Sequence, residues 1–143
     1  HWGLTAEDAR ADNNYALRES CANDHLSVVQ FLAEHWGLTA MDARAEDNFA
    51  LRESCANGHL SVVQFLAEHW GLTAEDARAD NNYALRESCA NDHLSVVQFL
   101  AEHWGLTAMD ARAEDNFALR ESCANGHLSV VQFLAEHWGL TAE

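Results

Sequence analysis

The chain of 143 residues contains no proline, no lysine and no isoleucine. Its longest apolar runs are two or three residues, as at Val28 and Val29, whereas a transmembrane helix needs about 20. The opening segment HWGLTAED also lacks the basic and apolar regions of a signal peptide. These absences argue against a membrane span and a membrane partner, and the expected location is the cytoplasm.

Positive charge is scarce as well. The formal net charge is −15, and each of the arginines lies among aspartates and glutamates. A protein that binds a phosphate backbone needs a basic patch, because the phosphates must be neutralised. The composition therefore excludes nucleic acid as an expected partner, and the apolar fraction of 48% is that of an ordinary globular chain.

What the chain does contain is a repeat. The segment HLSVVQFLAEHWGLTA begins at His25, His59, His93 and His127, a period of 34 residues. Residues 1–68 recur without change as residues 69–136, and HWGLTAE then closes the chain as it opened it. Exact duplication favours an artificially amplified array, with a very recent natural expansion as the alternative. The two versions of the repeat differ at Glu7/Met41, Asp12/Glu46, Asn13/Asp47, Tyr15/Phe49 and Asp24/Gly58.

One unit, residues 39–72, shows how a repeat should fold. Thr39 and Asp42 have the spacing of a capping box, which predicts a short helix over about 40–45. Asn48 is expected to cap the next helix, FALRESCAN, because Asn bonds free N–H groups well from that position. Gly58 should then turn the chain in a left-handed conformation, with Asp24 in the same place in the other version.

The second helix of the unit should run from about Leu60 to Trp70, with apolar residues on more than one face. Gly71 is expected to end it in the left-handed conformation, and Leu72 to pack back on its last turn. One unit cannot bury so wide an apolar face, so each must stack on the next. The sequence thus predicts one domain over 1–143, with helix pairs at about 14–36, 48–70, 82–104 and 116–138.

The segment NGHLSVVQFLAEHWG at 57–71 resembles the second half of an ankyrin repeat, with its Gly-His-Leu turn and Val-Val pair. The first half, FALRESC, keeps Leu51, Ser54 and Cys55 where the family has Leu and small residues, and GLTAMDARAEDN replaces the family's connector. The resemblance implies a right-handed stack of helix pairs that serves as a protein-binding scaffold. The prediction is an all-α, ankyrin-like α-solenoid of stacked antiparallel helix pairs, with a short helical connector in place of the β-hairpin finger.

The cysteines and histidines invite a chemical interpretation. Stacked helices lie about 8–10 Å apart, so equivalent cysteines should exceed the Cα separation of about 7 Å that a disulfide allows, and should not share one zinc ion. His25 and His35 stand at opposite ends of one helix, about 15 Å apart. Packing is therefore favoured for Cys21 and its copies, and capping or solvation for the histidines, over metal binding or catalysis. No catalytic residue, metal or cofactor is predicted.

The resemblance also implies that the first helix of each pair borders a concave surface, the usual binding face of such stacks. The alternative is a ladder of solvated charges, since exposed ion pairs contribute little. The residues predicted for a protein-binding face are Tyr15, Arg18, Glu19, Phe49, Arg52, Glu53, Tyr83, Arg86, Glu87, Phe117, Arg120 and Glu121.

A surface that evolved for one irregular partner would differ between repeats, whereas these copies present almost the same face. The function predicted is therefore a non-enzymatic scaffold with a generic protein-binding surface, no specific natural partner and no small-molecule substrate. The alternative is a self-assembling unit, since neither end of the sequence carries a polar capping repeat and head-to-tail contacts form open fibres.

Overall fold

The computed structural model describes residues 2–140, which form twelve α-helices and no strand. The all-α prediction is confirmed for this part of the chain. Each repeat contributes one short and two longer helices. Their bounds are α1 Ala6–Ala9, α2 Ala11–Ala22, α3 Leu26–His35, α4 Ala40–Ala43, α5 Ala45–Ala56, α6 Leu60–Trp70, α7 Ala74–Ala77, α8 Ala79–Ala90, α9 Leu94–Glu102, α10 Ala108–Ala111, α11 Ala113–Ala124 and α12 Leu128–Trp138.

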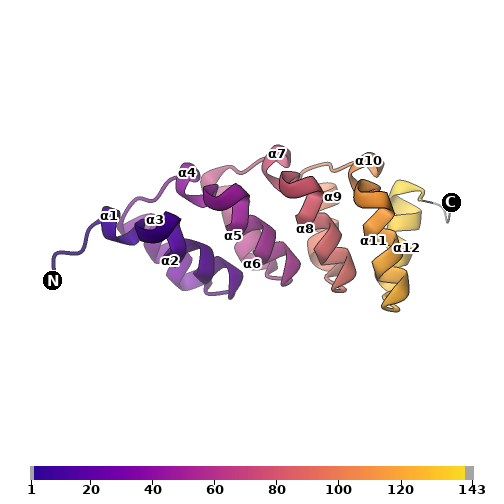
Figure 1. Cartoon of the computed structure of the whole chain (residues 1–143), viewed down its shortest axis with the longest axis horizontal. Helices are drawn as coiled ribbons and strands as arrows, with labels where there is room; N and C mark the ends of the chain where they lie inside the picture. The colour runs from indigo at the N-terminus through magenta and orange to yellow at the C-terminus, as the bar shows by residue number, and fades with distance from the viewer. Residues whose placement is uncertain (1, 141–143) are drawn as a thin grey trace.

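The repeats follow one another along the molecule. The helices α2, α5, α8 and α11 form one row, with α3, α6, α9 and α12 in a second row behind it and the short helices along one edge (Figure 1). Neighbouring members of the first row make the most extensive helix contacts, so each repeat packs on the next. The first helix, α1, and the last, α12, lie at opposite ends of the row (Figure 1). None of the described helices is long and apolar enough to cross a membrane.

Each repeat opens with the predicted capping box. The Thr39 amide donates a 2.8 Å hydrogen bond to Asp42 Oδ2, and Ala40–Ala43 is a single helical turn. A carboxylate in the first turn also interacts favourably with the helix dipole. Thr5, Thr73 and Thr107 make the same box in the other repeats.

A left-handed turn separates each short helix from the helical stretch that follows it. Glu46, Asp47 and Asn48 have φ angles of 56°, 55° and 62°, and the copies at 12–14, 80–82 and 114–116 are alike. The prediction that Asn48 caps the next helix is wrong. A capping residue needs extended backbone, and the left-handed Asn48 instead directs its amide to Asp76 of the next repeat, at 3.2 Å. A left-handed residue with a Cβ costs about 1–2 kcal/mol, so other contacts must stabilise this turn.

The left-handed turn predicts that a change to glycine stabilises the fold at one position and destabilises it at another. Replacing Glu114, which is exposed and left-handed, with glycine should raise the free energy of unfolding by about 0.5–1 kcal/mol, because glycine has no Cβ to clash. The control Glu121→Gly, further along α11, should lower it by about 1 kcal/mol. Urea unfolding of both variants measures the difference. Destabilisation by both changes would show that the turn is not left-handed.

The turn and the second helix of the pair agree with the sequence prediction. Gly58 is left-handed with φ 75°, and Asp24 and Asp92 take the same conformation. Helix α6 ends at Trp70, and Gly71 follows with φ 63°. The Leu72 amide approaches the Leu66 carbonyl at 3.5 Å, and the Leu72 side chain is buried.

The core runs through the whole row as one apolar cluster. It is built from Leu and Val of the longer helices and from small residues, including Cys21, Cys55 and Cys89, which are buried and unpaired. Since small side chains allow helices to approach closely, these cysteines serve packing. Cys123, the fourth copy, is exposed on the last repeat.

Candidate functional site

The residues predicted for a binding face are brought together in one ladder of rings and guanidinium groups. The Arg18 guanidinium carbon lies 5.6 Å from the centre of the Tyr15 ring and 5.1 Å from that of Phe49 in the next repeat. Arg52 and Arg86 bridge their own ring and the next one in the same way. Arg120 lies over Phe117. Glu19, Glu53, Glu87 and Glu121 sit beside these groups, each partly exposed.

Each of these arginines also holds the left-handed turn of its own repeat. Arg52 Nε donates to the Asp47 carbonyl at 2.9 Å, and its Nη2 donates to the Glu46 carbonyl at 3.3 Å. Arg18, Arg86 and Arg120 make the equivalent pairs. A planar guanidinium suits this role because it can bond two acceptors and stack on rings at once. The sequence predicts these arginines on a surface, but no local pattern in it indicates their bonds to the turn.

The exchange Arg52→Lys should therefore lower the free energy of unfolding by about 1–2 kcal/mol, because lysine keeps the charge but can neither bond both carbonyls nor stack. Arg120→Lys should cost less, since Arg120 lies over one ring rather than two. Arg112→Lys is the control, because Arg112 has no side-chain partner among residues 2–140, and should change stability by less than about 0.5 kcal/mol. Equal losses of stability in all three variants would refute the role of the paired hydrogen bonds to the turn and of the ring stacking.

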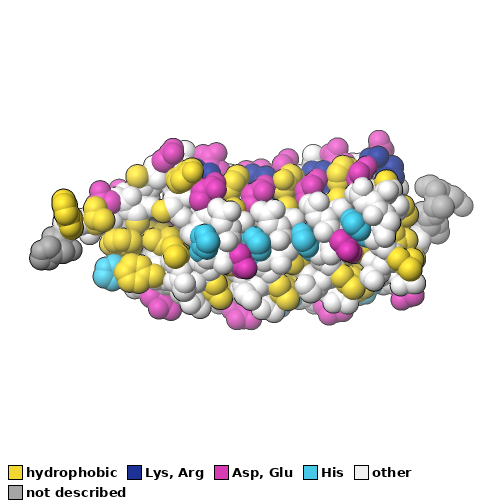
Figure 2. Space-filling view, turned by 90° about the horizontal axis from the view of Figure 1, so that it is seen from below, with side chains coloured by type: hydrophobic (Ala, Val, Ile, Leu, Met, Phe, Trp, Pro, Cys, Tyr) yellow, Lys and Arg dark blue, Asp and Glu magenta, His cyan; other side chains and the backbone are white. Residues whose placement is uncertain are grey.

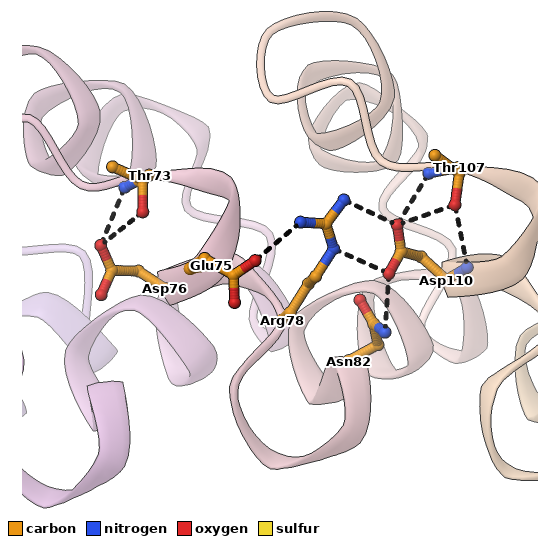
Figure 3. Close-up of polar contacts among 7 residues, drawn as sticks. All are labelled: Thr73, Glu75, Asp76, Arg78, Asn82, Thr107 and Asp110. Carbon is orange, nitrogen blue, oxygen red and sulfur yellow. Dashed lines mark hydrogen bonds and ion pairs between the residues drawn. The ribbon is translucent and has the colours of Figure 1, made fainter.

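A second set of polar contacts joins each repeat to the next. Arg78 Nε and Nη2 donate to the two carboxylate oxygens of Asp110 at 2.9 and 3.2 Å (Figure 3). Asn82 donates to the same carboxylate at 3.1 Å, and Thr107 donates to it from within its own repeat. The junctions centred on Asp42 and Asp76 repeat this arrangement.

The electrostatics of these carboxylates follow from their contacts. Burial alone would raise the pKa of Asp110, but the hydrogen bonds from Arg78, Thr107 and Asn82 outweigh it and hold that pKa below its usual value. The amide oxygens of Asn14, Asn48 and Asn82 are buried without a hydrogen-bond partner. The same side-chain amides donate their N–H groups to the aspartates, so the polar contacts of each junction centre on the carboxylate.

An asparagine and a tryptophan reach across each of the three junctions to backbone carbonyls, and a histidine does so at two of them. Asn57 Nδ2 donates to the Ala22 carbonyl at 3.1 Å, and His59 Nε2 contacts the same oxygen at 3.0 Å. The Trp70 indole N–H donates to the Leu38 carbonyl at 2.8 Å. Histidine side chains form a row on the face that carries the turns between the two longer helices of each repeat (Figure 2). His59 and His127 thus contact the preceding repeat through their rings.

No group of three or more His, Cys, Asp or Glu side chains among the described residues could hold a metal ion. Burial raises the pKa of the Cys21 and Cys89 thiols to about 12. Burial also raises the pKa of the Cys55 thiol, so these three sulfurs stay protonated and weakly nucleophilic. On the face built by the sequence-predicted residues, the arginines bond to backbone carbonyls of their own repeats.

Neither the protein-family models nor the curated protein sequences include a match to this chain.

Proposed function

We propose that the chain is a non-enzymatic, ankyrin-like α-solenoid that acts as a rigid scaffold, with a short helix in each repeat where ankyrin repeats place a hairpin finger. The observation that carries this proposal is the recurrence of one set of contacts at three successive junctions, centred on Asp42, Asp76 and Asp110. Contacts of this kind fix the position of each repeat on the last one.

The proposed interaction surface is the ladder formed by α2, α5, α8 and α11. Its rings and guanidinium groups are held by stacking and by the bonds to the turns, so little side-chain freedom is lost when a partner binds. The partly exposed glutamates beside the ladder recur at the same position in every repeat. Because the copies are nearly identical, the surface suits a protein partner in general and no one natural partner.

The rigidity of the scaffold can be measured with spin labels. Labels attached to Glu34→Cys and Glu102→Cys, two repeats apart and exposed, should give one narrow distance distribution when Cys123 is replaced by serine. Chelators should leave the distribution unchanged. A broad distribution would refute the scaffold.

The binding face can be tested by selection. One library varies Glu19, Glu53 and Glu87 on the ladder, and a control library of equal size varies Glu34, Glu68 and Glu102 on the second row of helices. Selection against the same unrelated target protein should yield binders from the ladder library in clear excess. Equal yields would show that the ladder is not a preferred interaction surface.

A further inference from the structure

The outer face of the last repeat is uncovered. Leu128 is 66% exposed, and Cys123, Ala124 and Ala135 are exposed although their copies in the other repeats are buried. A hollow of about 250 Å³ lies on this face, lined by Ser122, Cys123, Gly126, His127, Leu128 and Val131. At each junction inside the chain the next repeat covers the equivalent face.

The opposite face, on the first repeat, is uncovered in the complementary way. Val28 is 47% exposed, whereas its copies Val62, Val96 and Val130 are completely buried. Ala16 is exposed as well, although its copies are buried against the preceding repeat. The two outer faces therefore match the two sides of an internal junction.

The polar groups of the two faces are complementary too. Inside the chain an arginine bonds the aspartate 32 residues further on, as Arg78 bonds Asp110. The same step from Arg112 leads past the end of the chain, to the position that Asp8 of a second copy takes when the exact period is continued. Among residues 2–140, only Thr5 bonds the Asp8 carboxylate. In the same register Asn116 would meet that carboxylate, and Asn23 and His25 of the second copy would meet the Ala124 carbonyl.

We propose that a second copy of this chain docks head-to-tail on the last repeat, with Arg112 of one copy bonded to Asp8 of the next. The proposal rests on the repeat scaffold described above. The occupant is a copy of the chain because its first repeat carries the groups that fill this face at three internal junctions. The net charge of −15 opposes the approach of two copies, so salt should strengthen the association.

One segment stands in the way. Residues 1–7 and 137–143 have the same sequence, so both copies would place HWGL at one position of the continued array. In the first copy Trp138 ends α12 and Leu140 is buried, while Trp2 is 93% exposed at the other end. The N-terminal segment is the one that must move aside. Because this displacement costs free energy, residues 1–4 should lower the association constant of two copies.

Sedimentation velocity from micromolar to millimolar concentration tests the proposal. The intact chain should form elongated oligomers, and removal of residues 1–4 together with residues 141–143 should raise the association constant about tenfold, because the sequence HWGLTAE then occurs only once at the junction of two copies. A chain that stays monomeric with and without these residues, at low and at high salt, would overturn the proposal. It would leave the scaffold untouched if the spin-label distances stay narrow.

Charge reversal tests the register of docking. Asp8→Arg and Arg112→Asp should each lower the association constant at least about tenfold, and an equimolar mixture of the two variants should restore it. Glu7→Arg changes the net charge as Asp8→Arg does but lies outside the junction, so it should not weaken association. Failure of the mixture to restore association would refute the pairing of Arg112 with Asp8.

The thiol of Cys123 separates this mode from any other association. It is exposed, whereas the other three cysteines are buried, so a thiol reagent should label Cys123 first. A docked copy covers this thiol, and its labelling should slow in step with association. Oligomers in which Cys123 reacts at the rate of the monomer would overturn the proposal.

Discussion

Replacing Asp76 with alanine should lower the free energy of unfolding by about 2–4 kcal/mol, among the largest effects of any polar substitution in the chain. The buried carboxylate accepts hydrogen bonds from Arg44 at 2.9 and 3.2 Å, from the Thr73 amide at 2.8 Å and from Asn48 at 3.2 Å. Alanine would leave the donors of two repeats without their common acceptor. Urea unfolding at neutral pH measures the loss.

The chain carries its own control for this prediction. Asp8 occupies the same position in the first repeat and makes the same capping box with Thr5, but no arginine or asparagine among residues 2–140 bonds its carboxylate. Asp8→Ala should therefore cost only about 1 kcal/mol, the usual value of a lost cap. If the two substitutions cost the same, the contacts between repeats contribute nothing and only the cap matters.

The pH dependence follows from the same carboxylate. Burial would raise the pKa of Asp76, but the bonds from Arg44, Thr73 and Asn48 prevail and lower it. A carboxyl with a lowered pKa in the folded state stabilises the fold above its unfolded pKa of about 4, and this stabilisation is lost as the pH falls through the folded value. The stabilities of the wild type and of Asp76→Ala should therefore converge in acid. A difference that stays constant from neutral to acidic pH would contradict the charge-based explanation.

The sequence predicted those features that depend on neighbouring residues. The box between Thr39 and Asp42 and the end of α6 at Gly71 are set within one or two helical turns, and both are present. The period then carries each local prediction through the chain. The packing of one repeat on the next was expected from the width of the apolar face of the second helix.

What the sequence did not predict depends on partners in the next repeat. The spacing of 32 residues between Arg44 and Asp76 falls short of the period by two, and it has meaning only once the left-handed turn is known to direct both Arg44 and Asn48 across the junction. Three left-handed residues in succession contradict local preference, since only glycine adopts that conformation freely. The bonds from Arg52 to the turn show how the tertiary structure overrides the preference.

The alternation of Asp24 and Gly58 also has a structural correlate that no local pattern shows. A Cβ at Gly58 would lie 2.5 Å from Nδ1 of His93, too close for a real contact. At the neighbouring junction the His59 ring lies beside Asp24 instead, with Nδ1 3.8 Å from the carboxylate. The histidine at the junction is therefore placed differently beside the two versions of the repeat: His93 lies against Gly58, and His59 lies beside Asp24.

The largest apolar effect should come from Leu72→Ala, which is expected to lower the free energy of unfolding by about 2–4 kcal/mol. The Leu72 side chain is 3% exposed and belongs to the continuous core. Its backbone is held as well, because the Leu72 carbonyl accepts the Trp104 indole N–H at 2.9 Å. The neighbouring repeats are thus held in place around the side chain, and the cavity left by alanine cannot collapse easily.

Leu4 is the matched control, since it occupies the same position of the repeat but is 62% exposed. Leu4→Ala should change the free energy of unfolding by less than about 0.5 kcal/mol, as surface substitutions usually do. The difference between the two variants measures what burial of this side chain contributes, because the residue and its flanking sequence HWGLTA are the same. Equal effects would mean that Leu72 acts only within its own turn, and the repeats would then owe their order to the polar junctions alone.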